Sequence, residues 1–272
     1  MKLLYLVANQ EMTESRASFV AEVAHRLEAD LQILVASGDE SVFENAKASY
    51  EKVQHVFERS HHQARFVQGD PVEAMEGELS SDEYDMIVFA VGRRKRLIPS
   101  QYRLLSQQVI KKAKVPVLLV RQSSKLLDRM LVCTGGLEIS EPVVSLSARL
   151  AGKVGMEATL LTVAAPVPSM YTGMAEMDET MEELLETDTP LAQHLRRSAK
   201  VLTDNGISSE VKVIHGDVVE GILEEAAAGN FDLVALGSTE GLTLRGILLG
   251  NVTQQIINRA ACAVLVVKNN PR

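Results

Sequence analysis

Short apolar, β-branched runs alternate with longer amphipathic stretches along the whole chain. The apolar runs are typical of buried strands, and the stretches between them place apolar residues at helical spacing. In the first half this pattern predicts strands at 2–8, 31–36, 64–68, 85–91 and 116–121, with helices at 13–29, 40–60, 71–80 and 101–113. Such alternation predicts right-handed βαβ units built on a parallel sheet.

The second half of the chain repeats the first. The turn Gly69–Glu73 returns 147 residues later as Gly216–Glu220, and the same offset aligns residues 69–121 with 216–268 without a gap. Identity at 14 of these 53 positions indicates a duplicated unit. The second half is therefore expected to have strands near 129–134, 156–163, 209–214, 231–237 and 262–268.

Two domains are expected, at 1–124 and 125–272, because the polar run 121–125 is typical of a linker. The starts of the halves align at an offset of 127, so the second domain contains about 20 additional residues, expected at 166–190. This segment is acidic and rich in methionine. One helix face there combines Met170, Met174, Met177, Met181 and Leu185. The segment is expected to lie over its own domain as a lid, to pack on a partner, or to remain mobile. Plain packing onto the body of the domain is the alternative.

Composition and charge exclude several classes of protein. Apolar residues make up 46% and charged residues 24% of the chain, which is typical of globular proteins and not of disordered or fibrous ones. No apolar run approaches the roughly 18 residues of a membrane span. Cys133 and Cys262 lie in apolar runs, which predicts reduced core thiols and a cytoplasmic location. A net charge of −8 argues against nucleic-acid binding.

The segment after the fourth predicted strand of the second half is rich in glycine. In an open parallel sheet, ligands bind beyond the carboxyl ends of the strands. Four glycines here, Gly237, Gly241, Gly246 and Gly250, allow backbone amides to approach a ligand, and the helix that follows offers its N-terminal N–H groups to an anion. A phosphate site is one interpretation of this pattern, and ordinary turn and cap chemistry is the other.

These motifs resemble the universal stress protein family. The resemblance rests on the Gly-Asp-x-Val-Glu turn, the strand Phe231–Ser238, and the run Leu248–Thr253 followed by the strand Val264–Lys268. It covers essentially the whole chain as a tandem pair. It implies an α/β fold of two Rossmann-like domains of the adenine nucleotide alpha hydrolase type, each a five-stranded parallel sheet with helices on both faces.

The resemblance also implies where a nucleotide would bind. Nucleotide-binding members have Gly-x2-Gly-x9-Gly-Ser/Thr after the fourth strand, and Gly237 and Gly250 stand 13 positions apart as that motif requires. Glu240 replaces the second glycine and Asn251 replaces the Ser/Thr, and a carboxylate in such a loop repels phosphates. ATP-binding members usually have an Asp after the first strand, where this chain has Gly135.

The candidate nucleotide site of the second domain, for ATP with Mg²⁺, combines these positions with their neighbours. Gly241 can replace the missing glycine if the loop shifts register, Arg245 or Thr253 can meet phosphate oxygens, and the backbone around Val163 can contact adenine. The turn 134–140 also resembles the pyrophosphate loop of adenylating ATPases, with a plain glycine turn as the alternative. The complete candidate set is Thr134, Gly135, Gly136, Val163, Gly237, Ser238, Gly241, Arg245, Gly250, Asn251, Val252 and Thr253.

The first domain has the fold signature without the glycines, so its site is expected to be degenerate. Ala90 and Arg103 stand at the positions of Gly237 and Gly250. The loop between Ala90 and Arg103 has four consecutive cations, which suit either an anionic ligand or plain solvation. They are Arg93, Arg94, Lys95 and Arg96.

The leading expectation is a non-catalytic stress-response protein whose second domain binds ATP or another adenine nucleotide weakly. No paired nucleophile and base or metal cluster is evident in the sequence. The alternatives are a slow nucleotide hydrolase or adenylate-transferring enzyme, and a nucleotide-free scaffold. The resemblance implies that the final strands, 115–120 and 262–267, pair at their exposed edges, within the chain or in a homodimer.

Overall fold

The computed structural model describes residues 1–90, 100–121, 127–135, 140–164, 181–238 and 246–268. All ten predicted strands form, and the α/β fold with parallel strands is confirmed. The strands are β1 (Lys2–Ala8), β2 (Asp30–Ser37), β3 (His62–Gln68), β4 (Met86–Ala90), β5 (Val117–Val120), β6 (Arg129–Cys133), β7 (Glu157–Ala164), β8 (Ser209–His215), β9 (Leu233–Ser238) and β10 (Ala263–Lys268).

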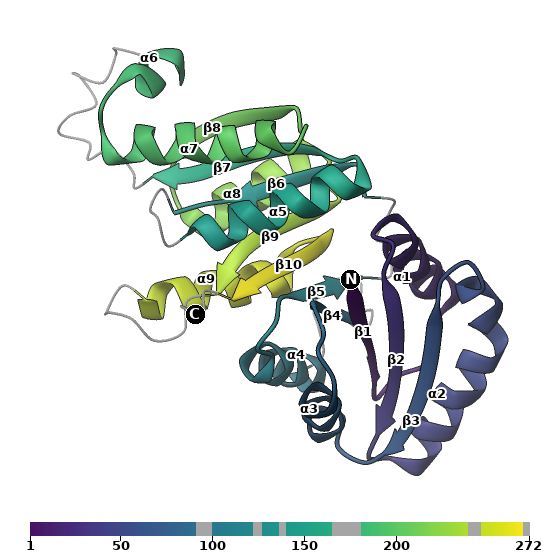
Figure 1. Ribbon diagram of the computed structural model, residues 1–272. Coiled ribbons are helices and arrows are strands. Elements are labelled where there is room, and N and C mark those ends of the chain that lie inside the picture. The colour runs from purple at the N-terminus through teal and green to yellow at the C-terminus, as the bar shows by residue number, and fades with distance from the viewer. Residues whose placement is uncertain (91–99, 122–126, 136–139, 165–180, 239–245, 269–272) are drawn as a thin grey trace. The chain divides into compact units, whose positions relative to one another are not determined.

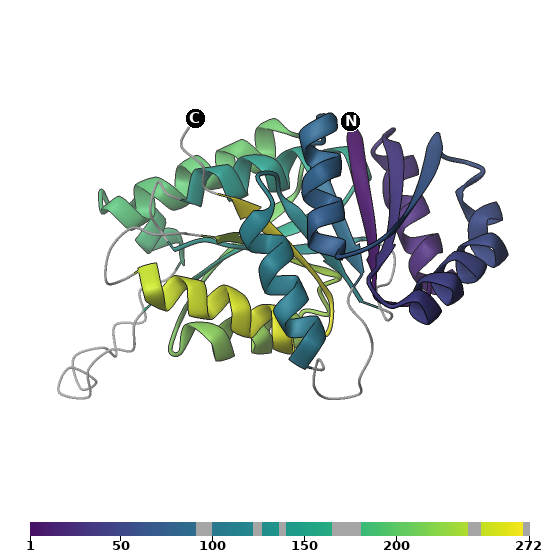
Figure 2. The ribbon, with the colours of Figure 1, turned by 90° about the horizontal axis from the view of Figure 1, so that it is seen from below.

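Helices alternate with the strands, as the periodicity predicts. They are α1 (Glu14–Arg26), α2 (Glu40–Val53), α3 (Pro71–Ser81), α4 (Ser100–Lys112), α5 (Glu141–Val154), α6 (Met181–Glu186), α7 (Pro190–Asp204), α8 (Val218–Ala228) and α9 (Gly246–Arg259). In the first half, α1 and α2 cover one face of the strands and α3 and α4 cover the other (Figure 1). In the second half, α5 packs against α7 and α8 packs against α9 (Figure 2).

The chain divides into two compact units. The first comprises Met1–Leu127 with Ala261–Val266, and the second comprises Asp128–Ala260 with Val267–Arg272. In the first unit the strand order is β3-β2-β1-β4-β5-β10, and in the second it is β9-β6-β7-β8. Strands β1 to β5 are parallel to one another, as are β6 to β9. The expected linker residues 122–126 lie outside the described residues.

The last strand of the chain belongs to the sheet of the first unit. Strand β10 pairs antiparallel with β5, joining Val264 to Leu119 and Val266 to Val117. The expected pairing of the two final strands is thus confirmed within the chain. All residues of β5 are buried, and the pairing covers an edge that would otherwise present free backbone groups. A homodimer stays a prediction.

Matching hydrogen bonds in the two units support the duplication. Asp70 caps α3 by accepting the backbone N–H groups of the second and third residues after it, at 2.8 and 3.0 Å. Asp217 caps α8 in the same way, at 2.9 and 3.0 Å. The strand registers agree too, because β1 pairs Leu3 with Met86 and β6 pairs Met130 with Leu233. The offsets of 127 and 147 are therefore structural equivalences.

A strand-to-helix ion pair also occurs in both units. Arg65 of β3 donates to Glu78 of α3 at 2.8 Å, and Lys212 of β8 donates to Glu225 of α8 at 2.9 Å. In the first unit the Tyr84 hydroxyl donates to the buried Glu78 carboxylate at 2.7 Å. Burial, followed by this bond to Glu78, raises the pKa of Tyr84. The second unit has a phenylalanine at the equivalent position.

Several helix ends differ from the prediction. The helix expected over 13–29 ends at Arg26, because Glu28 adopts a left-handed φ of 50° that stops the helix. The helix expected over 40–60 ends at Val53 and continues as a 3-10 turn to Phe57. Of the expected methionine-rich helix, α6 forms over Met181–Glu186, and residues 165–180 lie outside the described ranges.

The cysteines differ in burial. Cys133 ends β6 and is buried, as expected. Cys262 precedes β10 by one residue and is only half-buried, so the expectation that it is a core residue is wrong. In the part of the chain that the structure describes, no helix combines the length and the apolar character needed to cross a bilayer.

The Glu78 cluster predicts a stability difference between two tyrosine substitutions. Tyr84→Phe removes a hydrogen bond to a buried carboxylate and should lower the free energy of unfolding by about 1.5–3 kcal/mol. Tyr50→Phe is the matched control, because the Tyr50 hydroxyl makes no hydrogen bond with the described residues. Urea unfolding of both variants measures the difference. Equal losses would contradict the role given to Glu78.

Candidate functional site

In the second unit, the candidate residues meet at the carboxyl edge of the sheet. The register pairs Val132 of β6 with Ala235 of β9. Thr134 and Gly237, each two residues further along, therefore leave adjacent strands at the same level. Val163 lies near the end of β7, on the other side of β6, and is half-buried. The sheet thus brings together predicted site residues from three strands.

Strand β9 is joined to α9 by a hydrogen bond between two candidate residues. The Thr253 hydroxyl donates to the Gly237 carbonyl at 3.1 Å, and Thr253 is buried. Because α9 begins at Gly246, Gly250 and Asn251 lie in its second turn, where helical geometry gives their N–H groups partners within the helix. The N–H groups left for an anion are those of the first turn, residues 246–249.

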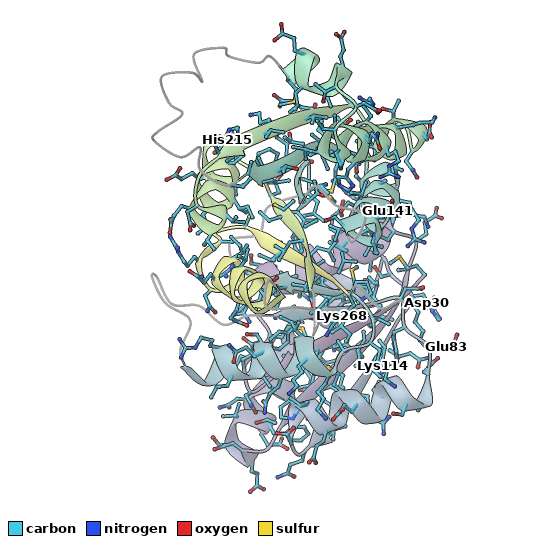
Figure 3. The ribbon with its side chains drawn as sticks, turned by 90° about the vertical axis from the view of Figure 1, so that its left-hand side faces the viewer. Asp30, Glu83, Lys114, Glu141, His215 and Lys268 are labelled. Atoms are coloured by element: carbon cyan, nitrogen blue, oxygen red, sulfur yellow. The ribbon has the colours of Figure 1, made fainter. Side chains whose placement is uncertain are left out.

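In the turn after β6, the Gly135 N–H is already hydrogen-bonded to a side chain of the same turn. The Gly135 N–H donates to Ser140 Oγ at 3.1 Å, and among the atoms of the described residues a Cβ at position 135 would come nearest to that oxygen, at 3.9 Å. A side chain would therefore fit at position 135. Helix α5 then begins with Glu141, which is exposed (Figure 3). Its carboxylate lowers the attraction of this helix N-terminus for a further anion.

A buried histidine, which the sequence analysis missed, holds the Thr134 side chain. His194 of α7 is only 1% exposed, and its Nε2 lies 2.6 Å from Thr134 Oγ1 and 3.4 Å from Ser198 Oγ. This contact turns the Thr134 hydroxyl toward α7. The available signal was the position of His194 on the apolar face of its helix, next to Leu195.

Two further candidate residues lie on β9 and α9. Ser238 ends β9 and is half-buried, and Val252 of α9 is half-buried too. The remaining predicted residues lie outside the described ranges, and they are Gly136, Gly241, Arg245, Arg93, Arg94, Lys95 and Arg96. Among the described residues, no group of three or more His, Cys, Asp or Glu side chains is arranged to hold a metal ion.

The first unit has a cavity of about 490 Å³ at the carboxyl edge of its sheet. The sequence analysis missed this cavity. The available signal was the position of Asp39 between β2 and α2 and of Asp70 between β3 and α3. Ser37 ends β2, and Asp39 and Asp70 cap α2 and α3. The lining residues are Asn9, Ser37, Gly38, Asp39, Val42, Asp70, Pro71 and Leu105.

In the first unit, a buried polar pair links the segment after β1 to the end of β4. Gln10 Nε2 donates to the Ala90 carbonyl at 2.6 Å, and Arg16 Nη1 donates to Gln10 Oε1 at 2.7 Å. Ala90 is the equivalent of Gly237, so Gln10 binds the carbonyl that Thr253 binds in the second unit. The Arg16 charge also acts on Tyr5, whose pKa is raised by burial and lowered to a smaller degree by Arg16.

Comparisons with known proteins agree with this architecture. The universal stress protein family matches residues 127–268. A universal stress protein of Methanocaldococcus jannaschii is 26% identical over 150 residues, which cover 55% of this chain and 87% of that protein. A solved universal stress protein of Archaeoglobus fulgidus aligns over 98% of both chains with a TM-score of 0.68 and 18% identity, so it shares the tandem fold. A universal stress protein solved in complex with cAMP aligns over 54% of this chain and 100% of its own, with 21% identity and a TM-score of 0.43.

The contact of Thr134 with His194 predicts opposite effects for two Thr→Val substitutions. Thr134→Val removes a partner of a buried histidine and should lower the free energy of unfolding by about 1–3 kcal/mol. Thr162→Val should be neutral or stabilising, because among the described residues the buried Thr162 hydroxyl has no hydrogen-bond partner. Thermal and urea unfolding test both. A neutral Thr134→Val variant would overturn the interpretation.

Proposed function

Because the chain belongs to the universal stress protein family, we propose that it is a non-catalytic stress-response protein whose second unit binds ATP or another adenine nucleotide weakly. The observation that supports the proposal best is the meeting of Thr134 and Gly237 at one level of the carboxyl edge, with Thr253 holding α9 against it. Ligands of open parallel sheets bind at this edge.

The local charges and donors favour weak binding. The first-turn N–H groups of α9 suit a phosphate. In the sequence, Glu240 stands two residues after the end of β9, where the family motif has glycine, and a carboxylate at that position repels phosphate oxygens. Mg²⁺ bound with the nucleotide would offset part of this repulsion. The Gly135 N–H already donates to Ser140 Oγ, so it contributes little to ligand binding.

A second candidate function is slow nucleotide hydrolysis or adenylate transfer, and one observation favours it. A hydroxyl within 2.6 Å of a histidine nitrogen is the arrangement of an activated nucleophile and its base. Thr134 and His194 are, however, only 6% and 1% exposed, which leaves little access for a substrate. We therefore assign the pair a structural role and keep hydrolysis as an outcome of the test.

Substitution of Gly250 tests nucleotide binding without disturbing the helix. Gly250 lies inside α9, where leucine has the better helix propensity, so Gly250→Leu should fold. With ATP and Mg²⁺ at about 100 times Kd, the wild-type protein should gain about 2.7 kcal/mol of unfolding free energy, and Gly250→Leu should gain far less. Arg103→Leu at the equivalent position of the first copy is the matched control and should respond like wild type.

The other outcomes separate the competing functions. Adenine nucleotide that co-purifies without turnover agrees with the proposal. Phosphate release that is lost in Thr134→Val would replace it with a hydrolase. No co-purified nucleotide and no stabilisation by ATP in any variant would leave a nucleotide-free scaffold and contradict the proposal.

A further inference from the structure

We propose that the cavity of the first unit binds a small organic cation, of the class of aliphatic diamines, and not a nucleotide. The cavity lies entirely within the first unit, at the ends of β1 and β2 and at the starts of α2 and α3. Its volume of about 490 Å³ lies within the usual range for small-molecule sites. The inference does not depend on nucleotide binding in the second unit.

Two carboxylates give the cavity its charge. Among the described residues that line it, Asp39 and Asp70 carry a charge. Each uses Oδ1 to cap its helix, Asp39 for Val42 N–H at 3.0 Å and Asp70 for Val72 N–H at 2.8 Å. Among the described residues, nothing donates to Oδ2 of either side chain, so both atoms can accept a donor from a ligand.

The same caps weaken the usual attraction of helix N-termini for phosphate. In a phosphate site the first N–H groups of a helix point at the anion. Here Asp70 binds the Val72 and Glu73 N–H groups of α3, and Asp39 binds the Val42 N–H of α2. A phosphate at these helix ends would also meet the like charges of the two carboxylates. An ammonium group meets two acceptors of opposite charge.

The other lining residues can contact the methylene chain of a diamine and one of its polar ends. Val42, Pro71 and Leu105 offer hydrocarbon surface for a methylene chain. Asn9 and Ser37 add polar groups at the strand ends, with the Ser37 hydroxyl held by the backbone N–H of Asp39 at 3.2 Å. Arg16, the buried cation bound to Gln10, is not among the lining residues.

The second unit lacks half of this arrangement. Asp217 repeats the Asp70 cap on α8. The residues equivalent to Ser37, Gly38 and Asp39 are those at 164–166, however, and their sequence is Ala-Ala-Pro. The pair of carboxylates is therefore a feature of the first copy. This difference supplies a matched control, because Asp217 has the cap geometry of Asp70 without a second acid at the position of Asp39.

The test uses the full-length protein with putrescine as the probe and 1,4-butanediol as its uncharged counterpart. Asparagine caps a helix about as well as aspartate, so Asp39→Asn and Asp70→Asn remove charge without removing the cap. We expect putrescine to shift the methyl NMR signals of Val42 and Leu105 and butanediol to leave them unchanged. Each Asp→Asn substitution should weaken putrescine binding about ten-fold. Asp217→Asn should bind like wild type.

Three results would overturn the proposal. The first is no shift of the Val42 and Leu105 methyl signals at saturating putrescine. The second is equal affinity in wild type, Asp39→Asn and Asp70→Asn, which would indicate adventitious binding to the acidic surface. The third is a shift of the same methyl signals by ATP, which would mean that an anion enters the cavity. That result would favour the interpretation of the cations at 93–96 as part of an anion site. None of these results bears on Gly250→Leu, so the two proposals fail separately.

Discussion

Parallel pairing of β1 with β4, and of β6 with β9, determines where each candidate ligand group lies. In a parallel sheet every strand ends at the same edge, and helices on both faces leave that edge as the open end of the layers. The registers place Thr134 beside Gly237 in the second unit. They also place Gln10 where it reaches the Ala90 carbonyl in the first. A register shift of one residue would send these side chains to the opposite face.

The two copies keep the scaffold and differ at its edge. The Asp70 and Asp217 caps and the strand-to-helix ion pairs repeat with similar distances, because they fix how α3 and α8 leave their strands. At the edge, the first copy has the Arg16–Gln10 pair bound to the Ala90 carbonyl and two carboxylates around a cavity. The second has Gly237 with Thr253 across from it. One fold thus presents two different sets of ligand chemistry.

Local sequence patterns predicted the scaffold well and its edge poorly. Strands and the Asp70 turn follow from residues near one another in the chain, so periodicity and cap chemistry identify them. The contacts of Gln10 with Ala90 and of Thr134 with His194 join residues from different elements, 80 and 60 residues apart, and no local pattern encodes such contacts. The end of α1 depends on the left-handed conformation of Glu28, a residue type that seldom adopts it.

The central claim is that the copies differ in ligand chemistry, with nucleotide binding confined to the second. Hydrogen–deuterium exchange of the intact protein with saturating ATP and Mg²⁺ tests this most directly, because one experiment reports on both edges. Slower exchange is predicted in peptides that cover 130–140 and 233–256, with no change in those that cover 33–42 and 66–75. Slower exchange at 33–42 and 66–75, or in both copies equally, would contradict the account.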